Sequence, residues 1–411
     1  MSTFFWSIPK ENVKNLNKHA IIDLIRFTPN GISRVELARQ LNLTRAAITS
    51  IINDLQDLGI VDEVEGSHPA GRKPIVLEIN PDQGYVVGID LGSTHVTLLL
   101  ANLAAHVVKE IDLPVNVEDG PRVVLDKVNQ YLDELLDGTG LSQKDLKAIC
   151  LGVPGPVVLN EGMVSEPPIM PGWDKFPIES YVKSLWDVPS IVGNDAELGA
   201  VGEWAYGAGR GEKNLAYIKV GKGIGAGLLL DGQIYHGATG SAGEIGHITI
   251  DENGPLCSCG NRGCLEAMAG GNAVAKRAIE MVRKGQRTEL VSIHPVDKIK
   301  SSDVIAAACS GDLVSQQILT DAGAHLGTAI AGLVNLFNPS MVIIGGGVSQ
   351  IGDLLLEPIR KTVSKRSLKM ASRRLRISTA LLGRRSSAMG AVVQALSLVL
   401  HAKAETVDER R

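Results

Sequence analysis

The stretch GEIGHITIDENGPLCSCGNRGCLE, Gly243–Glu266, decides how the rest of the chain is interpreted. It brings together one imidazole and three thiols, those of His247, Cys257, Cys259 and Cys264. Thiolate and imidazole are the ligands that Zn²⁺ prefers, and four of them complete a tetrahedral structural site. Most of the chain's 5 cysteines fall in this stretch, which favours a metal site over ordinary buried or free cysteines.

Two carboxylates that zinc does not need, Glu244 and Glu266, flank these ligands. Folding of the loop around a metal ion would fix the position of both. Acidic hydrogen-bond acceptors beside a histidine suit a polyhydroxylated ligand, so the stretch also predicts a sugar site.

The spacing E-x-G-H followed by C-x-C-G-x-x-G-C-x-E resembles the signature of the ROK family, which contains repressors and sugar kinases, and every fixed position is present. The resemblance implies that His247 and the three cysteines hold structural zinc. It also implies that Glu244, His247 and Glu266 lie on or beside a bound sugar.

Composition limits the class of protein. The 411 residues are 44% hydrophobic, enough for two or three cores, and the net charge of −4 gives no overall bias toward nucleic acid. Any DNA contact must therefore come from a local basic patch. Cysteines in a metal pattern favour a reducing compartment, and we find neither a signal-peptide pattern nor an apolar run of about 18 residues. We expect a soluble cytoplasmic protein without membrane insertion.

The N-terminal segment, residues 1–82, predicts a winged helix-turn-helix. Apolar spacing favours a helix over Val13–Phe27, a capping box Ser33–Glu36 starts a second, and Thr44 caps a third. The third helix exposes residues suited to base edges: Arg45, Thr49 and Ser50.

Two alternating segments, Ile60–Val64 and Ile75–Ile79, predict the strands of a wing whose tip carries Arg72 and Lys73. The alternative is a small helical interaction domain with a solvated hairpin. The region resembles the winged helix of ROK-family and MarR-like repressors, which implies operator DNA as the partner.

From Tyr85 the pattern changes to α/β. A strand, glycine turn and strand over Tyr85–Leu103 recurs over Leu215–Leu230. This duplication resembles the two-lobed actin-like ATPase and sugar-kinase fold, which is ribonuclease H-like. We expect lobe 1 over residues 83–193, completed by a C-terminal helix within 387–411, and lobe 2 over residues 194–386.

Three glycine-rich loops resemble the nucleotide cleft of the family's kinases, although glycines also make ordinary strand turns. The residues concerned are Asp90, Gly92, Thr94, Gly221, Gly223, Gly225 and Gly346. Two departures from the kinase loops count against ATP and Mg²⁺ as cofactors: Ser93 replaces a glycine and Lys222 replaces a threonine.

The segment Gly193–Ala196 ends an apolar strand and opens a helix. Asp195 matches the aspartate that acts as general base in the family's kinases, and Asn194 would hydrogen-bond a neighbouring hydroxyl. The alternative is that Asp195 only caps the helix.

The leading hypothesis is a ROK-family transcriptional repressor that binds operator DNA and a monosaccharide, at least as a homodimer and alternatively as a homotetramer. The first alternative is an ATP-dependent, glucokinase-like sugar kinase with an N-terminal regulatory domain. A zinc enzyme is disfavoured, because four protein ligands leave no open metal position. A phosphotransferase-system protein could act in place of a small-molecule inducer. The sequence gives no support for such a partner and leaves this alternative open.

Overall fold

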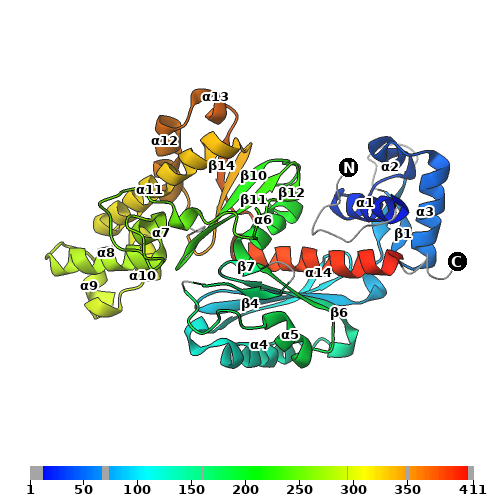
Figure 1. Ribbon diagram of the computed structural model, residues 1–411, viewed down its shortest axis with the longest axis horizontal. Helices are drawn as coiled ribbons and strands as arrows, with labels where there is room; N and C mark the ends of the chain where they lie inside the picture. The colour runs from blue at the N-terminus through cyan, green and yellow to red at the C-terminus, as the bar shows by residue number, and fades with distance from the viewer. Residues whose placement is uncertain are drawn as a thin grey trace.

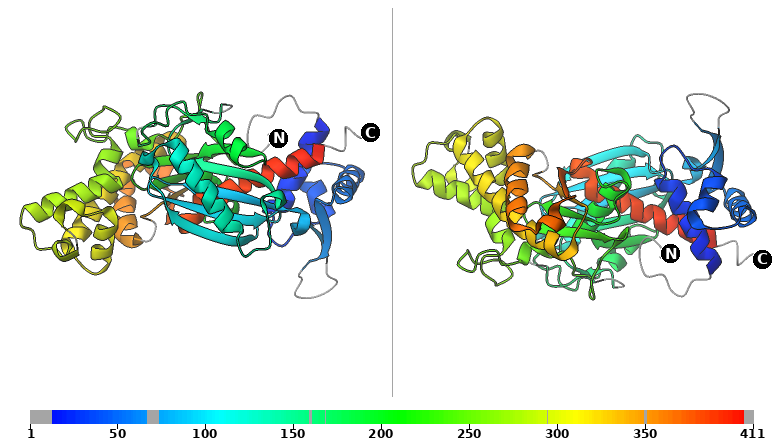
Figure 2. Two further views of the ribbon diagram at one scale, coloured as in Figure 1. Left: turned by 90° about the horizontal axis from the view of Figure 1, so that it is seen from below. Right: turned by 90° about the horizontal axis from the view of Figure 1, so that it is seen from above.

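The computed structural model describes residues 13–66, 74–158, 161–167, 169–293, 295–348 and 351–405. The predicted wing-tip residues Arg72 and Lys73 lie outside these ranges. Two α/β lobes, each built on a 5-stranded sheet, follow a small N-terminal unit (Figure 1). The N-terminal unit and the helical part of lobe 2 lie at opposite ends of an elongated molecule (Figure 2). The predicted α/β architecture is therefore confirmed.

The N-terminal unit is a winged helix-turn-helix. Its helices are α1 (Val13–Phe27), α2 (Arg34–Leu41) and α3 (Arg45–Asp57), and its wing pairs β1 (Val61–Glu65) antiparallel with β2 (Ile75–Ile79). The apolar stripes of the helices meet in one core, which contains Ile21, Leu37, Ile52 and Leu55. Burial of these stripes explains why short helices with modest intrinsic stability form here.

Side-chain caps start the two helices of the turn. Ser33 accepts a hydrogen bond from the amide of Glu36 at 3.2 Å, and Thr44 accepts one from the amide of Ala47 at 3.2 Å. The expected return bond of the capping box does not form. The Glu36 carboxylate instead accepts from Arg39, a charged donor one turn further along α2.

Lobe 1 contains the sheet β5-β4-β3-β6-β9. The strands are β3 (Tyr85–Leu91), β4 (His95–Asn102), β5 (Val107–Pro114), β6 (Leu146–Val153) and β9 (Ser190–Asn194). Helices α4 (Pro121–Leu136) and α5 (Ile178–Leu185) cover one face, and β7 (Val157–Val158) pairs with β8 (Met163–Val164) in a short hairpin. Trp173 is fully buried in this core and donates to the carbonyl of Val117, so it does not offer a stacking face to a sugar.

Lobe 2 contains the sheet β12-β11-β10-β13-β14. The strands are β10 (Leu215–Val220), β11 (Ile224–Leu230), β12 (Gln233–Ile234), β13 (Met341–Gly345) and β14 (Arg376–Thr379). Its helices are α7 (Leu265–Ala269), α8 (Gly271–Arg283), α9 (Leu290–Ile293), α10 (Ser301–Cys309), α11 (Leu313–Phe337), α12 (Asp353–Arg366) and α13 (Lys369–Ser372). The two sheets share one arrangement of strands, as the duplicated strand-turn-strand pattern of the sequence leads one to expect.

Helices α6 (Asp195–Tyr206) and α14 (Ser386–Glu405) pack against each other where the two lobes meet (Figure 1). Gly390 permits this close approach, because a Cβ there would lie 1.8 Å from the carbonyl oxygen of Leu198. Within the described residues, Gly383–Glu405 is long and apolar enough to cross a membrane, which the sequence analysis missed. Most of it is buried among α1, α6 and the lobe 1 sheet, so it is a core helix of this fold.

Candidate functional site

The four predicted metal ligands lie together in the loop that follows β12. The ligand atoms of His247, Cys257, Cys259 and Cys264 all lie within 4.8 Å of one another. Cys257 Sγ is 3.7 Å from His247 Nδ1, and Cys259 Sγ is 3.7 Å from Cys264 Sγ. One imidazole and three thiols at this separation fit a closed, four-coordinate metal site.

A tight backbone turn brings the last cysteine back to the histidine. Gly263 has a φ of +65°, and a Cβ there would lie 1.5 Å from the carbonyl oxygen of Asp251. Only glycine fits this position. The amide of Ile250 donates to the Gly263 carbonyl at 2.8 Å, so the segment carrying Cys264 is held beside the segment that follows His247.

The two flanking carboxylates are fixed by this loop. Glu266 lies in the first turn of α7, two residues after Cys264, and accepts a hydrogen bond from the amide of Ile224 at 3.0 Å. Ser258 donates to its other oxygen at 3.5 Å. Glu266 therefore joins the metal loop to the turn between β10 and β11.

Glu244 immediately precedes a short 3-10 helix, Ile245–His247. Burial raises the pKa of its carboxyl above the ordinary value; His247 opposes this rise, and the charges of Asp195 and Glu266 add to it. The charges of Asp195 and Glu266 therefore act on the partly buried carboxyl of Glu244.

Asn194 and Asp195, at the start of α6, have different roles. Asn194 caps the helix: its side-chain oxygen accepts from the amides of Ala196 at 2.9 Å and Glu197 at 3.0 Å. Its amide nitrogen donates to the carbonyl of Gly155 at 2.9 Å. Asn194, and not Asp195, therefore provides the side-chain cap of α6.

The carboxylate of Asp195 contacts a lysine that the sequence analysis did not single out. Lys219 Nζ lies 2.9 Å from Asp195 Oδ2 and 3.0 Å from both carboxylate oxygens of Asp90. Asp90 lies near the end of β3 in lobe 1, and Lys219 lies near the end of β10 in lobe 2. This ion pair therefore crosses between the lobes at the inner end of the cleft.

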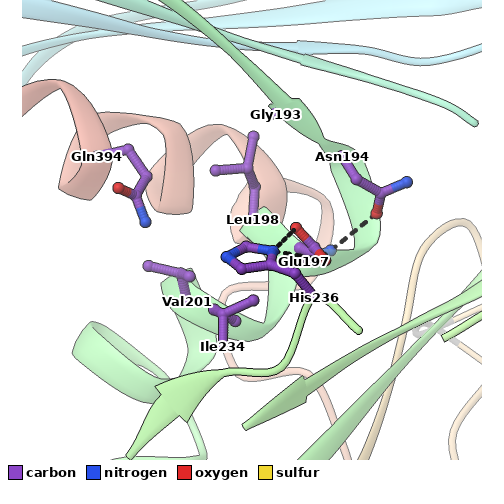
Figure 3. A pocket seen from close by; sticks show the side chains of 8 residues that line it. All are labelled: Gly193, Asn194, Glu197, Leu198, Val201, Ile234, His236 and Gln394. Atoms are coloured by element: carbon purple, nitrogen blue, oxygen red, sulfur yellow. Dashed lines mark hydrogen bonds and ion pairs between the residues drawn. The ribbon is translucent and has the colours of Figure 1, made fainter. Parts of the chain in front are cut away.

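A second, partly buried pair involves Glu197, which lies in the same first turn of α6 as Asp195. His236 Nδ1 lies 3.1 Å from each carboxylate oxygen of Glu197, and both side chains line a narrow cavity with Asn194 and Gln394 (Figure 3). The histidine thus holds the loop after β12 against the helix that carries Asp195.

A larger cavity of about 860 Å³ opens beside the metal loop. Cys257 and Glu266 line one side, α8 and α11 supply further walls, and Glu118 of lobe 1 faces Lys222 of lobe 2. Lys222 is paired with Glu118, so its side chain reaches across the cleft instead of into the turn where Gly221 and Gly223 lie.

The glycine-rich loops are closed turns. The amide of Gly92 donates to the carbonyl of His95, and the amide of Gly221 donates to that of Gly223, each at 2.9 Å. Gly225 lies opposite Lys219 in the sheet, and Thr94 is exposed. Gly346 has a φ of +82° and packs against the carbonyl of Val220. These turn and packing contacts do not test a nucleotide, so the nucleotide-binding role of these residues stays a prediction.

The predicted DNA-contacting residues of α3 face outward. Arg45, Thr49 and Ser50 are all exposed. Arg34 of α2 supports this surface: its guanidinium donates to Glu63 of β1 at 2.8 Å and to Gln56 of α3 at 2.9 Å. Helix α3 and the wing are thereby held in one orientation.

The winged helix-turn-helix rests on α14. Arg26 of α1 donates to the Ser397 hydroxyl at 2.9 Å and to the Val393 carbonyl at 3.0 Å. The carboxylate of Asp23 accepts from Arg26 at 3.3 Å and lies 3.2 Å from His401 Nε2. These buried charged contacts fix α1 on the C-terminal half of α14.

The sequence profile of the ROK family matches residues 86–397. This chain belongs to the ROK family. The xylose repressor of Caldicellulosiruptor bescii is 31% identical over 94% of this chain and 97% of its own length. A glucokinase of Halalkalibacterium halodurans is 37% identical, over 67% of this chain and 84% of its own length.

Among solved structures, a ROK family transcriptional regulator, a homologue of the E. coli MLC protein, is similar with a TM-score of 0.80. The likeness covers 97% of this chain and 99% of that one, at 26% identity. The similarity to regulators therefore includes the N-terminal unit, whereas the glucokinase matches a smaller part of this ROK protein.

Three features of this ROK protein escaped the sequence analysis: the cation between the lobes, the His236–Glu197 pair and the contact of α1 with α14. One signal was available for the first. Lys219 interrupts the otherwise apolar strand Leu215–Val220, and a charged residue in a buried strand requires a partner.

Proposed function

We propose that this ROK protein is a transcriptional repressor whose binding to operator DNA responds to a monosaccharide. The observation that supports this best is the position of α14. Near the start of this helix, the Ser387 hydroxyl donates to the main-chain carbonyl of Asp195 at 2.7 Å. Further along it, the Ser397 hydroxyl accepts a hydrogen bond from Arg26 of α1. The proposed sugar site and the DNA-binding unit thus share one rigid element.

In this proposal the sugar lies between the lobes, near Asp195, Glu244 and Glu266. Carboxylates accept hydrogen bonds from hydroxyl groups, and several of them fix the orientation of a sugar ring. Asn194 has one remaining amide hydrogen for a hydroxyl, and His247 contributes through the loop that it anchors. The identity of the sugar is tested with xylose, glucose and N-acetylglucosamine.

The metal is Zn²⁺ in the proposal, held by His247, Cys257, Cys259 and Cys264. Three thiolates and one imidazole favour zinc over hard cations such as Mg²⁺. When bound, the ion crosslinks the loop. Glu244 and Glu266 lie on either side of this crosslink in the sequence, so a folded loop holds both carboxylates in position.

Coupling is reciprocal. If the sugar favours a lobe arrangement that the operator does not, the operator weakens sugar binding by the same factor. We further propose at least a dimer, because a helix-turn-helix ordinarily binds two half-sites about one DNA turn apart. We also propose a cytoplasmic location, where a bacterial operator is accessible.

A thermal-shift experiment identifies the ligand, because a bound ligand raises the melting temperature by mass action. The three sugars are compared with and without ATP and Mg²⁺, on the wild type and on Asp195→Asn. The proposal expects one sugar to stabilise the wild type more than the variant, without help from ATP. Absence of stabilisation by every sugar at millimolar concentration would contradict the assigned site.

The second candidate is a sugar kinase, favoured by the glucokinase relative and by the position of Asp195. A coupled ATP assay with the stabilising sugar separates the two. Turnover of ~1–10³ per second, abolished in Asp195→Asn, would favour the kinase.

A further inference from the structure

Lys219 has glycine as its neighbour on both adjacent strands of the lobe 2 sheet. In the register of lobe 2, it lies between Gly225 of β11 and Gly345 of β13. Both neighbours lack side chains, so the side chain of Lys219 extends from the sheet without a side chain on either side of it. It leaves lobe 2 and reaches Asp90 near the end of β3 in lobe 1.

Four oxygens surround its ammonium group. They are the two carboxylate oxygens of Asp90, each at 3.0 Å, Asp195 Oδ2 at 2.9 Å and the hydroxyl of Ser387 at 3.1 Å. The side chains of Asp90, Asp195 and Lys219 are 5%, 13% and 17% exposed. Burial disfavours the charged amine, but the two carboxylates outweigh it and raise the pKa of Lys219 above its ordinary value.

Two carboxylates and a hydroxyl converging on one point are a donor set suited to a hard divalent cation. Phosphoryl transfer from a nucleotide needs such a cation, because the metal bridges the phosphates and neutralises the developing charge. A nucleophile also needs a base that is free to take a proton. Here the same point holds an ammonium group, and one oxygen of Asp195 is paired with it.

We propose that Lys219 is a built-in cation that takes the place of a divalent metal between Asp90 and Asp195. The cleft then keeps the acidic residues that bind a sugar, but it does not assemble a metal–nucleotide complex. The inference deepens the proposed function by naming the residue that separates sugar binding from phosphoryl transfer. The sequence-based prediction attributes the loss of ATP binding to Ser93 and Lys222. In the structure Lys222 pairs with Glu118, and the cation between Asp90 and Asp195 is Lys219.

A purely structural role for Lys219 makes a different prediction. If Lys219 only joins the two lobes, its removal would leave two buried carboxylates without a counter-charge and would lower the stability of the fold. A purely structural role gives no reason for a metal ion to bind where the ammonium group has been removed. Metal binding by the variant therefore distinguishes the two roles.

The experiment measures Mn²⁺ binding to the full-length, zinc-replete protein by electron paramagnetic resonance. Lys219→Met removes the ammonium at similar side-chain length. The double variant Lys219→Met/Asp90→Asn removes one carboxylate of the pair as well. Lys222→Met is the matched control, because it also removes a lysine from an ion pair at the cleft.

We expect Lys219→Met to bind about one more Mn²⁺ per chain than the wild type, at least tenfold more tightly than its remaining sites. Mn²⁺ should also raise the melting temperature of this variant. The double variant and Lys222→Met should gain no such site. A folded, zinc-replete Lys219→Met protein that gains no Mn²⁺ would overturn the proposal.

Should Lys219→Met not fold, the wild type and Asp90→Asn decide the matter. The proposal expects equal Mn²⁺ binding by these two proteins, because the ammonium group already occupies the pair. Loss of a wild-type Mn²⁺ site in Asp90→Asn would overturn it. These outcomes do not involve the sugar, so a failed sugar response would count against the proposed function and leave the assignment of Lys219 standing.

Discussion

Ser387 donates a hydrogen bond of 2.7 Å to the main-chain oxygen of Asp195, which ties the first turn of α14 to the first residue of α6. Further along α14, Ser397 and His401 contact α1 of the winged helix-turn-helix. A ligand that moves the start of α6 therefore acts on the helix that supports the DNA-binding unit.

The metal cluster gives the first prediction. Cys257→Ser and Cys264→Ser should each lose the metal, about one zinc per chain in the wild type, because a hydroxyl replaces a thiolate ligand. Folding and the sugar response should weaken together. Elemental analysis checks this, with Cys309→Ser as the control at an exposed cysteine outside the cluster. Metal-free wild-type protein with an intact sugar response would contradict the assignment.

The exposed face of α3 gives the second prediction. Arg45→Ala should relax sequence preference and cost about 1–3 kcal/mol in operator binding if the guanidinium contacts a base in two places. Fluorescence anisotropy with operator and scrambled duplexes measures both effects. The control is Arg277→Ala, which removes one positive charge from α8. Equal losses in the two variants would mean that only net charge matters.

A related variant tests the wing. Lys73→Ala should weaken binding to all duplexes and flatten its dependence on salt, because a phosphate contact releases counterions and carries no sequence information. Affinities over a range of salt concentration measure this slope. An unchanged slope would remove Lys73 from the proposed DNA surface.

Much of the fold follows from local patterns. The sequence predicts a helix at Val13–Phe27, and the structure has it with these bounds. One apolar stripe and one cap or proline suffice to define such helices. The metal cluster is equally local, since His247 and Cys264 lie close in the chain and the intervening glycines set the turn.

The remaining site depends on contacts between distant segments. Lys219 meets Asp90 across 129 positions, and Arg26 meets Ser397 across 371. Neither pair has a periodic signal, because each arises only when two sheets or two helices have already packed. The missing half of the capping box has a different cause, competition by Arg39 for Glu36.

The interface between α1 and α14 predicts sensitivity to acid. Burial, followed by the nearby His401, lowers the pKa of His19 to about 4, while Asp23 opposes this and Lys18 reinforces it. The folded state thus binds fewer protons than the unfolded state between about pH 6.5 and 4, and stability falls as the pH is lowered through this window. The partly exposed carboxylate of Glu405 lies 3.3 Å from His19 Nε2 and favours the protonated imidazole. The loss of unfolding free energy at pH 5 from this group is therefore at most about 2 kcal/mol.

Urea unfolding near neutral pH and near pH 5 measures this effect. His19→Gln should lose less stability on acidification than the wild type, whereas His106→Gln, at an exposed position, should lose as much as the wild type. An unchanged acid response in His19→Gln would show that His19 does not carry the effect.

Asp195 distinguishes sugar recognition from DNA binding. Asp195→Asn keeps the shape of the side chain but loses its charge, so sugar binding should weaken and the response should shift to higher sugar concentration. Operator affinity without sugar should stay within about twofold, because α3 is remote from the cleft. Calorimetry with the stabilising sugar and anisotropy with the operator measure the two quantities. Equal loss of both would indicate a general folding defect.

The most direct test of the central claim is the affinity of the full-length protein for its operator, selected from randomised duplexes, as the stabilising sugar is titrated. We predict a saturable decrease of about 5–150-fold, the range expected for a coupling of 1–3 kcal/mol. The midpoint should move to higher sugar concentration in Asp195→Asn. Operator affinity that stays constant while the sugar saturates the protein would contradict the account.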